Sequence, residues 1–264
     1  MKRIITVLLV FYSVMVFGQG ATPNLRSSPP FFTNMEFSNL IDETGNCTLT
    51  NNGATSTTGK RGNALSFDGI NDNVSSSTNS KLENTVGSFS FWVYPNVYSG
   101  NQIWVSINDG TTANRIVCYN SATTYFIFTS VSGIGGNRWT KTGLTTDIPL
   151  SQWTHIVATF NTVTDNYDIY VNGVQKTPTS TDTSGNPSGI DEISLGSRVD
   201  RSSSFYNGRL DEVYISSREL KEIEAKQQYA SGNGLLYVYD NFKNGKITFG
   251  EYLEYYLEYL KYKA

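Results

Sequence analysis

The segment Phe89-Ser90-Phe91-Trp92-Val93-Tyr94-Pro95 indicates a β-strand with two different faces. Successive side chains of a strand point to opposite sides of its sheet. One side is expected to face a core built from aromatic and β-branched residues, and it carries Phe89, Phe91 and Val93. The other side carries Ser88, Ser90 and Trp92.

Similar short segments follow one another from about residue 33 to 216, broken by clusters of Gly, Asn, Asp and Ser. Regularly spaced strands with no helical pattern between them indicate an antiparallel β-sandwich. One turn is also specified, because Asn172-Gly173 supplies the two positive φ values of a type I′ hairpin. The predicted strands are 64–67, 89–94, 103–107, 115–119, 125–128, 155–160 and 167–171, the last returning through 174–175.

The composition of the 264 residues agrees with an all-β extracellular domain and argues against a coiled coil or a large helical enzyme. Only 16% of the residues are charged, and 20 Lys and Arg stand against 23 Asp and Glu. This balance removes the electrostatic case for binding nucleic acid. A single His excludes multi-histidine zinc sites, and two Cys exclude a cysteine-rich framework.

The N-terminus has the layout of a secretory signal peptide over residues 1–18, with a basic start, an apolar stretch and a small residue, Gly18, before the cut. Its roughly 14 apolar residues fall short of the ~20 that a spanning helix needs. We therefore expect a secreted, extracellular or cell-surface protein, with the periplasm as an alternative, and no membrane span in the mature chain. In such a compartment Cys47 and Cys118 either form a disulfide, which we favour, or remain separate buried thiols.

The regions that flank the sandwich have their own patterns. Residues 19–32 are rich in Pro and Ser and are interpreted as a linker. Ser216-x-x-Glu219 fits a capping box and predicts a helix that runs to Tyr229. The tail, 231–264, is Tyr-rich and predicts an amphipathic helix over 249–262, which we expect to dock against the sandwich or a protein partner.

Six segments also carry recognisable motifs, and they occur in a fixed order. They are DETGN at 42–46, GNALSFDG at 62–69, FSFWVYP at 89–95, QWTHIV at 152–157, YVNG at 170–173, and GRLDEVYI at 208–215 with REL at 218–220. Together they resemble the laminin-G-like (concanavalin A-like lectin/glucanase) jelly-roll family. The resemblance implies an antiparallel jelly-roll β-sandwich over residues 33–230, closed by the last strand and a short helix.

This superfamily includes glucanases, whose active strand carries Glu-x-Asp-x-x-Glu. No such motif occurs here, and the adjacent carboxylates in 190–193 and 210–213 fall on opposite faces of a strand. His155 lies in the strand where the family places a structural residue. We therefore expect a non-catalytic recognition or adhesion module that binds carbohydrate or a surface protein. The alternatives are a structural or assembly protein that docks through its C-terminal helix, and a glycoside hydrolase with atypical carboxylates.

The resemblance also implies a structural calcium ion, where the 42–46 loop meets the closing strand. Its candidate ligands are Asp42, Asn46 and Asp211, with Asp68 and Asp72 as weaker alternatives. Clustered oxygen ligands suit Ca²⁺. The alternative is that Asp42 and Asp68 only organise turns by accepting backbone N–H bonds.

A second calcium candidate lies in the tail, where residues 240–251 resemble a 12-residue EF-hand loop. Phe242 stands at the third position of this loop and cannot bind a cation, so the alternative is an Asn-Gly turn that leads into a helix. The candidate ligands are Asp240, Asn244, Thr248 and Glu251.

Glycan binding requires exposed aromatic rings beside polar groups. Trp92 and Trp153 match positions that are core in the family. Trp104 and Trp139 do not, and Trp139 lies in a Gly-rich loop, 133–139, in which an aromatic ring could be displayed. The alternative for each is ordinary packing. The candidate ligand-binding residues are Trp139, Arg138, Asn137 and Trp104.

Overall fold

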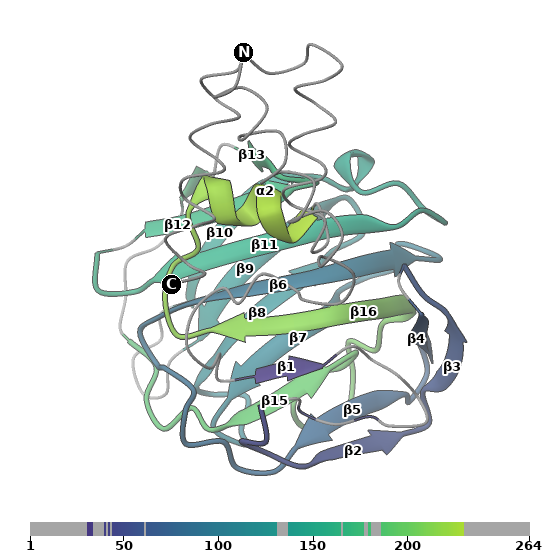
Figure 1. Cartoon of the computed structure of the whole chain (residues 1–264), viewed down its shortest axis with the longest axis horizontal. Coiled ribbons are helices and arrows are strands. Elements are labelled where there is room, and N and C mark those ends of the chain that lie inside the picture. The colour runs from purple at the N-terminus through teal and green to yellow at the C-terminus, as the bar shows by residue number, and fades with distance from the viewer. Residues whose placement is uncertain are drawn as a thin grey trace, which may run out of the picture. The chain divides into compact units, whose positions relative to one another are not determined.

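Two antiparallel sheets of eight strands each form a jelly-roll β-sandwich (Figure 1). The computed structural model describes residues 31–33, 40, 42, 44–60, 62–130, 137–164, 166–176, 179–180 and 186–229. These residues belong to one compact unit, Ser28–Tyr229. The predicted signal peptide, nearly all of the linker and the tail at 231–264 lie outside the described residues. Among the residues described, no helix is long and apolar enough to cross a membrane.

Sheet A has the strand order β13-β12-β11-β6-β16-β4-β3, with β1 also paired to β16. Its strands are β1 (Phe31–Thr33), β3 (Thr55–Thr58), β4 (Asn63–Asp68), β6 (Val86–Pro95), β11 (Thr154–Asn161), β12 (Asn166–Val171), β13 (Val174–Lys176) and β16 (Asn207–Ser216). The pairing of β1 brings the end of the predicted linker into the sheet.

Sheet B has the order β14-β10-β9-β8-β7-β15-β5-β2. Its strands are β2 (Leu49–Asn52), β5 (Asn73–Ser76), β7 (Gln102–Asn108), β8 (Arg115–Asn120), β9 (Thr124–Ser130), β10 (Asn137–Leu144), β14 (Thr179–Ser180) and β15 (Glu192–Leu195). All seven strands predicted from the sequence are present. A 3-10 turn, η2 (Thr145–Asp147), follows β10.

The predicted hairpin between β12 and β13 is confirmed. Asn172 and Gly173 have φ values of 50° and 75°, as a type I′ turn requires. The Asn172 side chain also accepts a hydrogen bond of 2.9 Å from the backbone N–H of His155, which ties the turn to β11.

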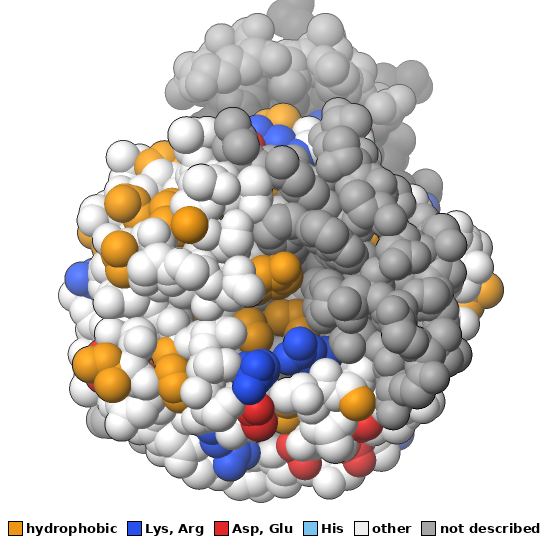
Figure 2. All heavy atoms as spheres, turned by 180° about the vertical axis from the view of Figure 1, so that it is seen from behind, with side chains coloured by type: hydrophobic (Ala, Val, Ile, Leu, Met, Phe, Trp, Pro, Cys, Tyr) orange, Lys and Arg blue, Asp and Glu red, His pale blue; other side chains and the backbone are white. Residues whose placement is uncertain are grey.

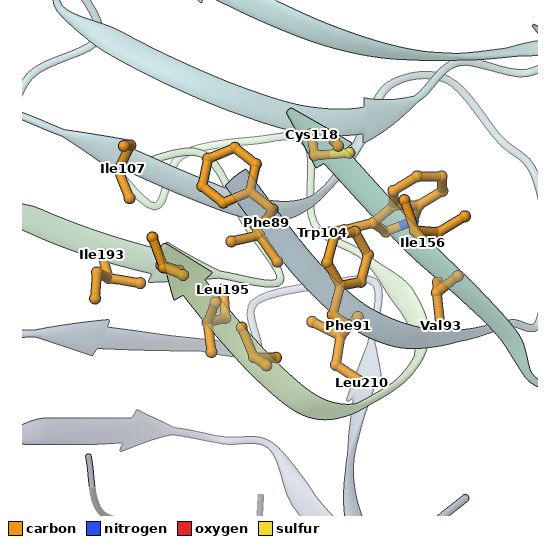
Figure 3. Packing of buried hydrophobic residues seen from close by; sticks show 14 of the residues in the cluster. Phe89, Phe91, Val93, Trp104, Ile107, Cys118, Ile156, Ile193, Leu195 and Leu210 are labelled. Atoms are coloured by element: carbon orange, nitrogen blue, oxygen red, sulfur yellow. The ribbon is translucent and has the colours of Figure 1, made fainter. Parts of the chain in front are cut away.

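The core lies between the two sheets, as the alternation of β6 predicts. Phe89, Phe91 and Val93 are all fully buried (Figure 3). Trp104 reaches them from β7 in the opposite sheet, and its ring centroid lies 5.9 Å from that of Phe91. The prediction that Trp104 binds ligand is therefore wrong: the ring has no exposed surface and packs in the core.

The helix that closes the domain, α2 (Glu222–Tyr229), starts six residues after the predicted cap. Ser216 is instead the last residue of β16, because its strand pairing to β6 continues to that position. The observed cap is at Lys221, whose backbone N–H donates 2.8 Å to Glu224. Figure 1 shows α2 over the outer face of sheet A. A second buried cluster joins it to the sheet through Val157, Tyr170, Tyr214, Leu220 and Ala225.

The favoured disulfide between Cys47 and Cys118 is also wrong, because both are free thiols. Cys118 lies in β8 in the middle of sheet B, whereas Cys47 precedes β2 at the sheet edge, with three strands between. At about 4.8 Å per strand, this separation exceeds the ~7 Å that a disulfide can span. Burial, followed by the nearby Asp42 carboxylate, raises the pKa of Cys47 to about 12. Burial also raises the pKa of Cys118.

Thiol titration of protein purified without reductant tests this correction. We expect two reactive thiols per chain in denaturant and almost no reaction of the native protein at pH 8, because both thiol pKa values are raised. A denatured chain that shows no thiol until it is reduced would contradict the structure.

Replacing Trp104 tests its position in the core. We expect Trp104→Ala to lower the free energy of unfolding by about 3–5 kcal/mol, because a fully buried ring leaves a cavity. Trp153→Ala is the matched control, since that ring is only half-buried. It should lower the free energy of unfolding much less. Denaturant unfolding followed by circular dichroism measures both, and equal losses would contradict this assignment.

Candidate functional site

The Asp42 carboxylate organises the turn that leads into β2. Its Oδ1 accepts hydrogen bonds from the backbone N–H and the hydroxyl of Thr44, at 3.0 and 2.6 Å. Its Oδ2 accepts from the backbone N–H groups of Asn46 and Cys47, at 2.9 and 3.1 Å. The side-chain amide of Asn46 donates to Thr44 at 2.7 Å. Both carboxylate oxygens therefore serve the turn, as the alternative interpretation expects.

Asp211, the third predicted calcium ligand, belongs to a strand. It lies fully buried in β16, with Trp92 as its Cα partner, near the middle of sheet A. Within the described residues, no group of three or more His, Cys, Asp or Glu side chains is arranged to hold a metal ion. A site of Asp42, Asp211 and the side chain of Asn46 contains only two residues of these types, so calcium binding there stays a prediction.

Asp68 and Asp72 organise the turn between β4 and β5. The Asp68 carboxylate accepts 2.7 Å from the backbone N–H of Ile70, and Asp72 accepts 2.9 Å from the backbone N–H of Asp68. Burial raises the pKa of Asp72 above its ordinary value, although the bond from Asp68 opposes this shift. The second calcium candidate, with Asp240, Asn244, Thr248 and Glu251, lies outside the described residues.

Asn137, Arg138 and Trp139 form the start of β10 and not a loop. Their Cα partners in β9 are Ser130, Thr129 and Phe128. The sequence-based placement of these residues in a Gly-rich loop is therefore wrong, because backbone pairing extends the strand to Asn137. Their role in binding stays a prediction.

A group that the sequence analysis missed lies on the outer face of sheet A, where β6 ends and β11 and β16 begin. Trp153, Tyr94 and Arg209 form a line across these three strands, because Thr154 pairs with Val93 and Arg209 pairs with Tyr94. We call these three residues the outer aromatic row. All three are half-buried.

The side chains of the outer aromatic row pack on one another. The ring centroids of Tyr94 and Trp153 lie 5.4 Å apart at an interplanar angle of 61°, an edge-to-face contact. The guanidinium of Arg209 lies over the ring of Tyr94, 4.6 Å from its centroid. The row therefore presents two aromatic surfaces and a fixed cation at one end of the sheet.

Trp92 lies two residues before Tyr94 and on the same face of β6. Its ring centroid lies 5.0 Å from His155 and 5.7 Å from Tyr229 of α2. The ammonium of Lys60 lies over it at 4.6 Å. Trp92 itself is buried, as the family position predicts.

His155 stays neutral at ordinary pH. It is almost fully buried, and its Nε2 lies 3.0 Å from the Ser90 hydroxyl. Burial lowers its pKa from 6.5 to about 3. His155 is therefore a structural residue that packs Trp92 in place, as the sequence analysis expected.

Trp153 was missed because its family position is classed as core. The alternation of β11 contains the missing signal: Ile156, Ala158 and Phe160 face the core, so His155 and Trp153 face outward. Whether that outer face is open or covered depends on tertiary packing.

The burial of His155 predicts a pH dependence of stability. Between pH 6.5 and about 3 the unfolded chain binds a proton that the folded chain does not. The free energy of unfolding should therefore fall as pH decreases, by at most about 1.4 kcal/mol per pH unit from this group. Denaturant unfolding from pH 7 to 4 should show a steeper loss for the native chain than for His155→Gln. Parallel curves would contradict the assignment.

Solved structures with the same fold include several binding domains. The binding domain of botulinum neurotoxin serotype G aligns with a TM-score of 0.61 and 15% identity over 76% of this chain and 50% of that one. The binding domain of Paraclostridial Mosquitocidal Protein 1 gives 0.59 and 17% over 77% and 52%. This chain thus spans about half the length of the toxin domains.

Domain 4 of AbnA, a GH43 extracellular arabinanase from Geobacillus stearothermophilus solved with arabinotriose, aligns over 98% of its own length and 77% of this chain. Its TM-score is 0.56 and its identity 18%. At these identities the likeness concerns the fold alone. No curated protein matches the sequence.

A family model does match the sequence directly, over residues 68–226. This range runs from the end of β4 into α2 and includes every residue of the outer aromatic row. The expectation drawn from the six motifs is confirmed: the chain belongs to the concanavalin A-like lectin/glucanases superfamily.

Proposed function

We propose that this protein is a secreted, non-catalytic binding module that recognises carbohydrate through the outer aromatic row. The observation that carries the proposal is the half-buried pair Tyr94 and Trp153 beside the cation of Arg209. Ligand sites combine apolar and aromatic surface with a few fixed polar groups. The C–H face of a sugar ring can pack on the aromatic surface, and its hydroxyls can accept hydrogen bonds from the guanidinium.

The row has the rigidity that such a site needs. Tyr94 and Arg209 lie on paired strands in the interior of sheet A, and Trp153 directly precedes β11. On the same face, Trp92 packs against the buried His155. Binding groups held by a scaffold lose little conformational entropy when the ligand arrives. Aromatic side chains also carry much of the binding energy where they form contacts.

The similar structures support a binding role. One was solved in complex with arabinotriose, and the others are the binding domains of a botulinum neurotoxin and of Paraclostridial Mosquitocidal Protein 1. The absence of the glucanase motif from the sequence supports a non-catalytic role. The row contains no carboxylate, whereas glycoside hydrolysis ordinarily uses two of them on either side of the scissile bond. The signal-like N-terminus supports secretion.

A glycan array with residues 19–264 tests the proposal. We expect binding to a subset of glycans, and we expect Trp153→Ala and Tyr94→Ala each to weaken the affinity at least about tenfold, as loss of an aromatic anchor does. Tyr119→Ala is the matched control, because Tyr119 is a half-buried tyrosine of sheet B. It should leave binding unchanged.

Two outcomes would count against the proposal. Folded protein that binds no glycan would favour a surface protein as the ligand. Loss of binding in Trp139→Ala but not in Trp153→Ala would move the site to β10. Repeating the array after EDTA tests the calcium prediction separately.

A further inference from the structure

Two cations lie over neighbouring aromatic rings on the same face of β6. Arg209 lies over Tyr94 and Lys60 over Trp92, each 4.6 Å from the ring centroid. Tyr94 and Trp92 are two residues apart on one strand, which places them roughly 7 Å apart along it. Arg209 is thus part of the outer aromatic row, and Lys60 lies over the neighbouring ring of Trp92.

Neither cation has a carboxylate partner among the described residues. Other basic side chains do: Arg198 pairs with Asp200 at 2.7 Å, and Lys176 pairs with Asp147 at 3.0 Å. Figure 2 shows such basic and acidic side chains side by side on the opposite face of the molecule. Within the described residues, the contacts of these two cations are with aromatic ring faces. An aromatic ring orients a cation without neutralising it, so the charge remains available to a ligand.

The strand pairing places the carboxylate of Asp211 near Trp92, but this carboxylate is not an ion-pair partner of either cation. Asp211 is the Cα partner of Trp92, but it is fully buried and forms no ion pair with Lys60 or Arg209 in the described part of the chain. Lys60 is exposed and Arg209 is half-buried, so both can reach a molecule that lies on the row.

We propose that the ligand of the outer aromatic row is an anionic saccharide, carrying carboxylate or sulfate groups. This inference rests on the proposed function and adds the chemical class of the ligand. A sugar ring would pack on Trp153 and Tyr94, while its anionic group accepts charge-assisted hydrogen bonds from Arg209 and is attracted by Lys60. Stacking on Tyr94 restricts Arg209 before the ligand binds, which lowers the entropic cost of binding.

General attraction to polyanions does not account for such binding. The chain has a formal net charge of −3, so its overall field repels acidic polymers. Selective binding of an acidic saccharide would have to come from local cations. Such binding would therefore differ from non-specific attraction between a basic protein and a polyanion.

Isothermal titration with residues 19–264 tests the inference on oligomers of matched length. The probes are oligogalacturonate for carboxylate, a sulfated dextran oligomer for sulfate, and neutral dextran and arabinan oligomers. We expect at least one acidic probe to bind at least about tenfold more tightly than the neutral ones. Arg209→Gln and Lys60→Gln should each weaken binding of the acidic probe about tenfold. Lys60→Gln should leave neutral binding nearly unchanged, and Arg209→Gln should weaken neutral binding less than acidic binding. Raising the salt concentration should weaken only the acidic complex.

Lys81→Gln is the matched control, because Lys81 is an exposed lysine in the turn after β5 and has no place in the row. It should change nothing, and thermal unfolding checks that every variant is folded. Arg209→Lys keeps the charge but loses the planar donors, so it should restore part of the affinity.

The outcomes separate the two proposals. Neutral and acidic probes that bind equally would overturn the anionic inference and leave the carbohydrate proposal standing. Acidic binding that survives both Arg209→Gln and Lys60→Gln would also overturn the inference. Folded protein that binds none of the probes, and none of the glycans on the array, would overturn both.

Discussion

The alternation of strand β6 is the constraint on which both the fold and the candidate site depend. Its inward side chains, Phe89, Phe91 and Val93, are fully buried between the sheets. Its outward side chains, Trp92 and Tyr94, form the aromatic surface of sheet A. The strand is paired on both sides, by β11 and β16, so its register cannot slip without exposing the core. The packing of the core therefore also determines where the outer aromatic rings stand.

The outer face of sheet A is buried at one end and half-buried at the other. Helix α2 covers Val157, Tyr170 and Tyr214 with Leu220 and Ala225. The ring of its last residue, Tyr229, lies 5.7 Å from that of Trp92. His155 is desolvated at this boundary and its pKa is lowered to about 3. Beyond it, the row of Trp153, Tyr94 and Arg209 is only half-buried, so the same face serves packing at one end and, as we propose, recognition at the other.

Local patterns predicted much of the fold. The seven strands, the Asn172-Gly173 hairpin and the family followed from alternation, turn chemistry and motif order, all of which act over a few residues. The helix start at Glu222 was misjudged because Ser216 satisfies both a capping pattern and a strand, and pairing with β6 decides between them. The predicted disulfide is wrong for a similar reason, since the strand order of sheet B separates Cys47 from Cys118.

The sequence by itself determined the periodicity of each strand, and hence which side chains share a face, because neighbouring side chains in a strand must point to opposite sides. It could not determine which faces are covered, because burial arises from segments far apart in the chain. Packing between the sheets placed Trp104 in the core and not in a ligand site. Pairing of three distant strands placed Trp153, Tyr94 and Arg209 in one line. The candidate site thus depends on the register of the paired strands and on which sheet faces are buried, and only the tertiary structure decides both.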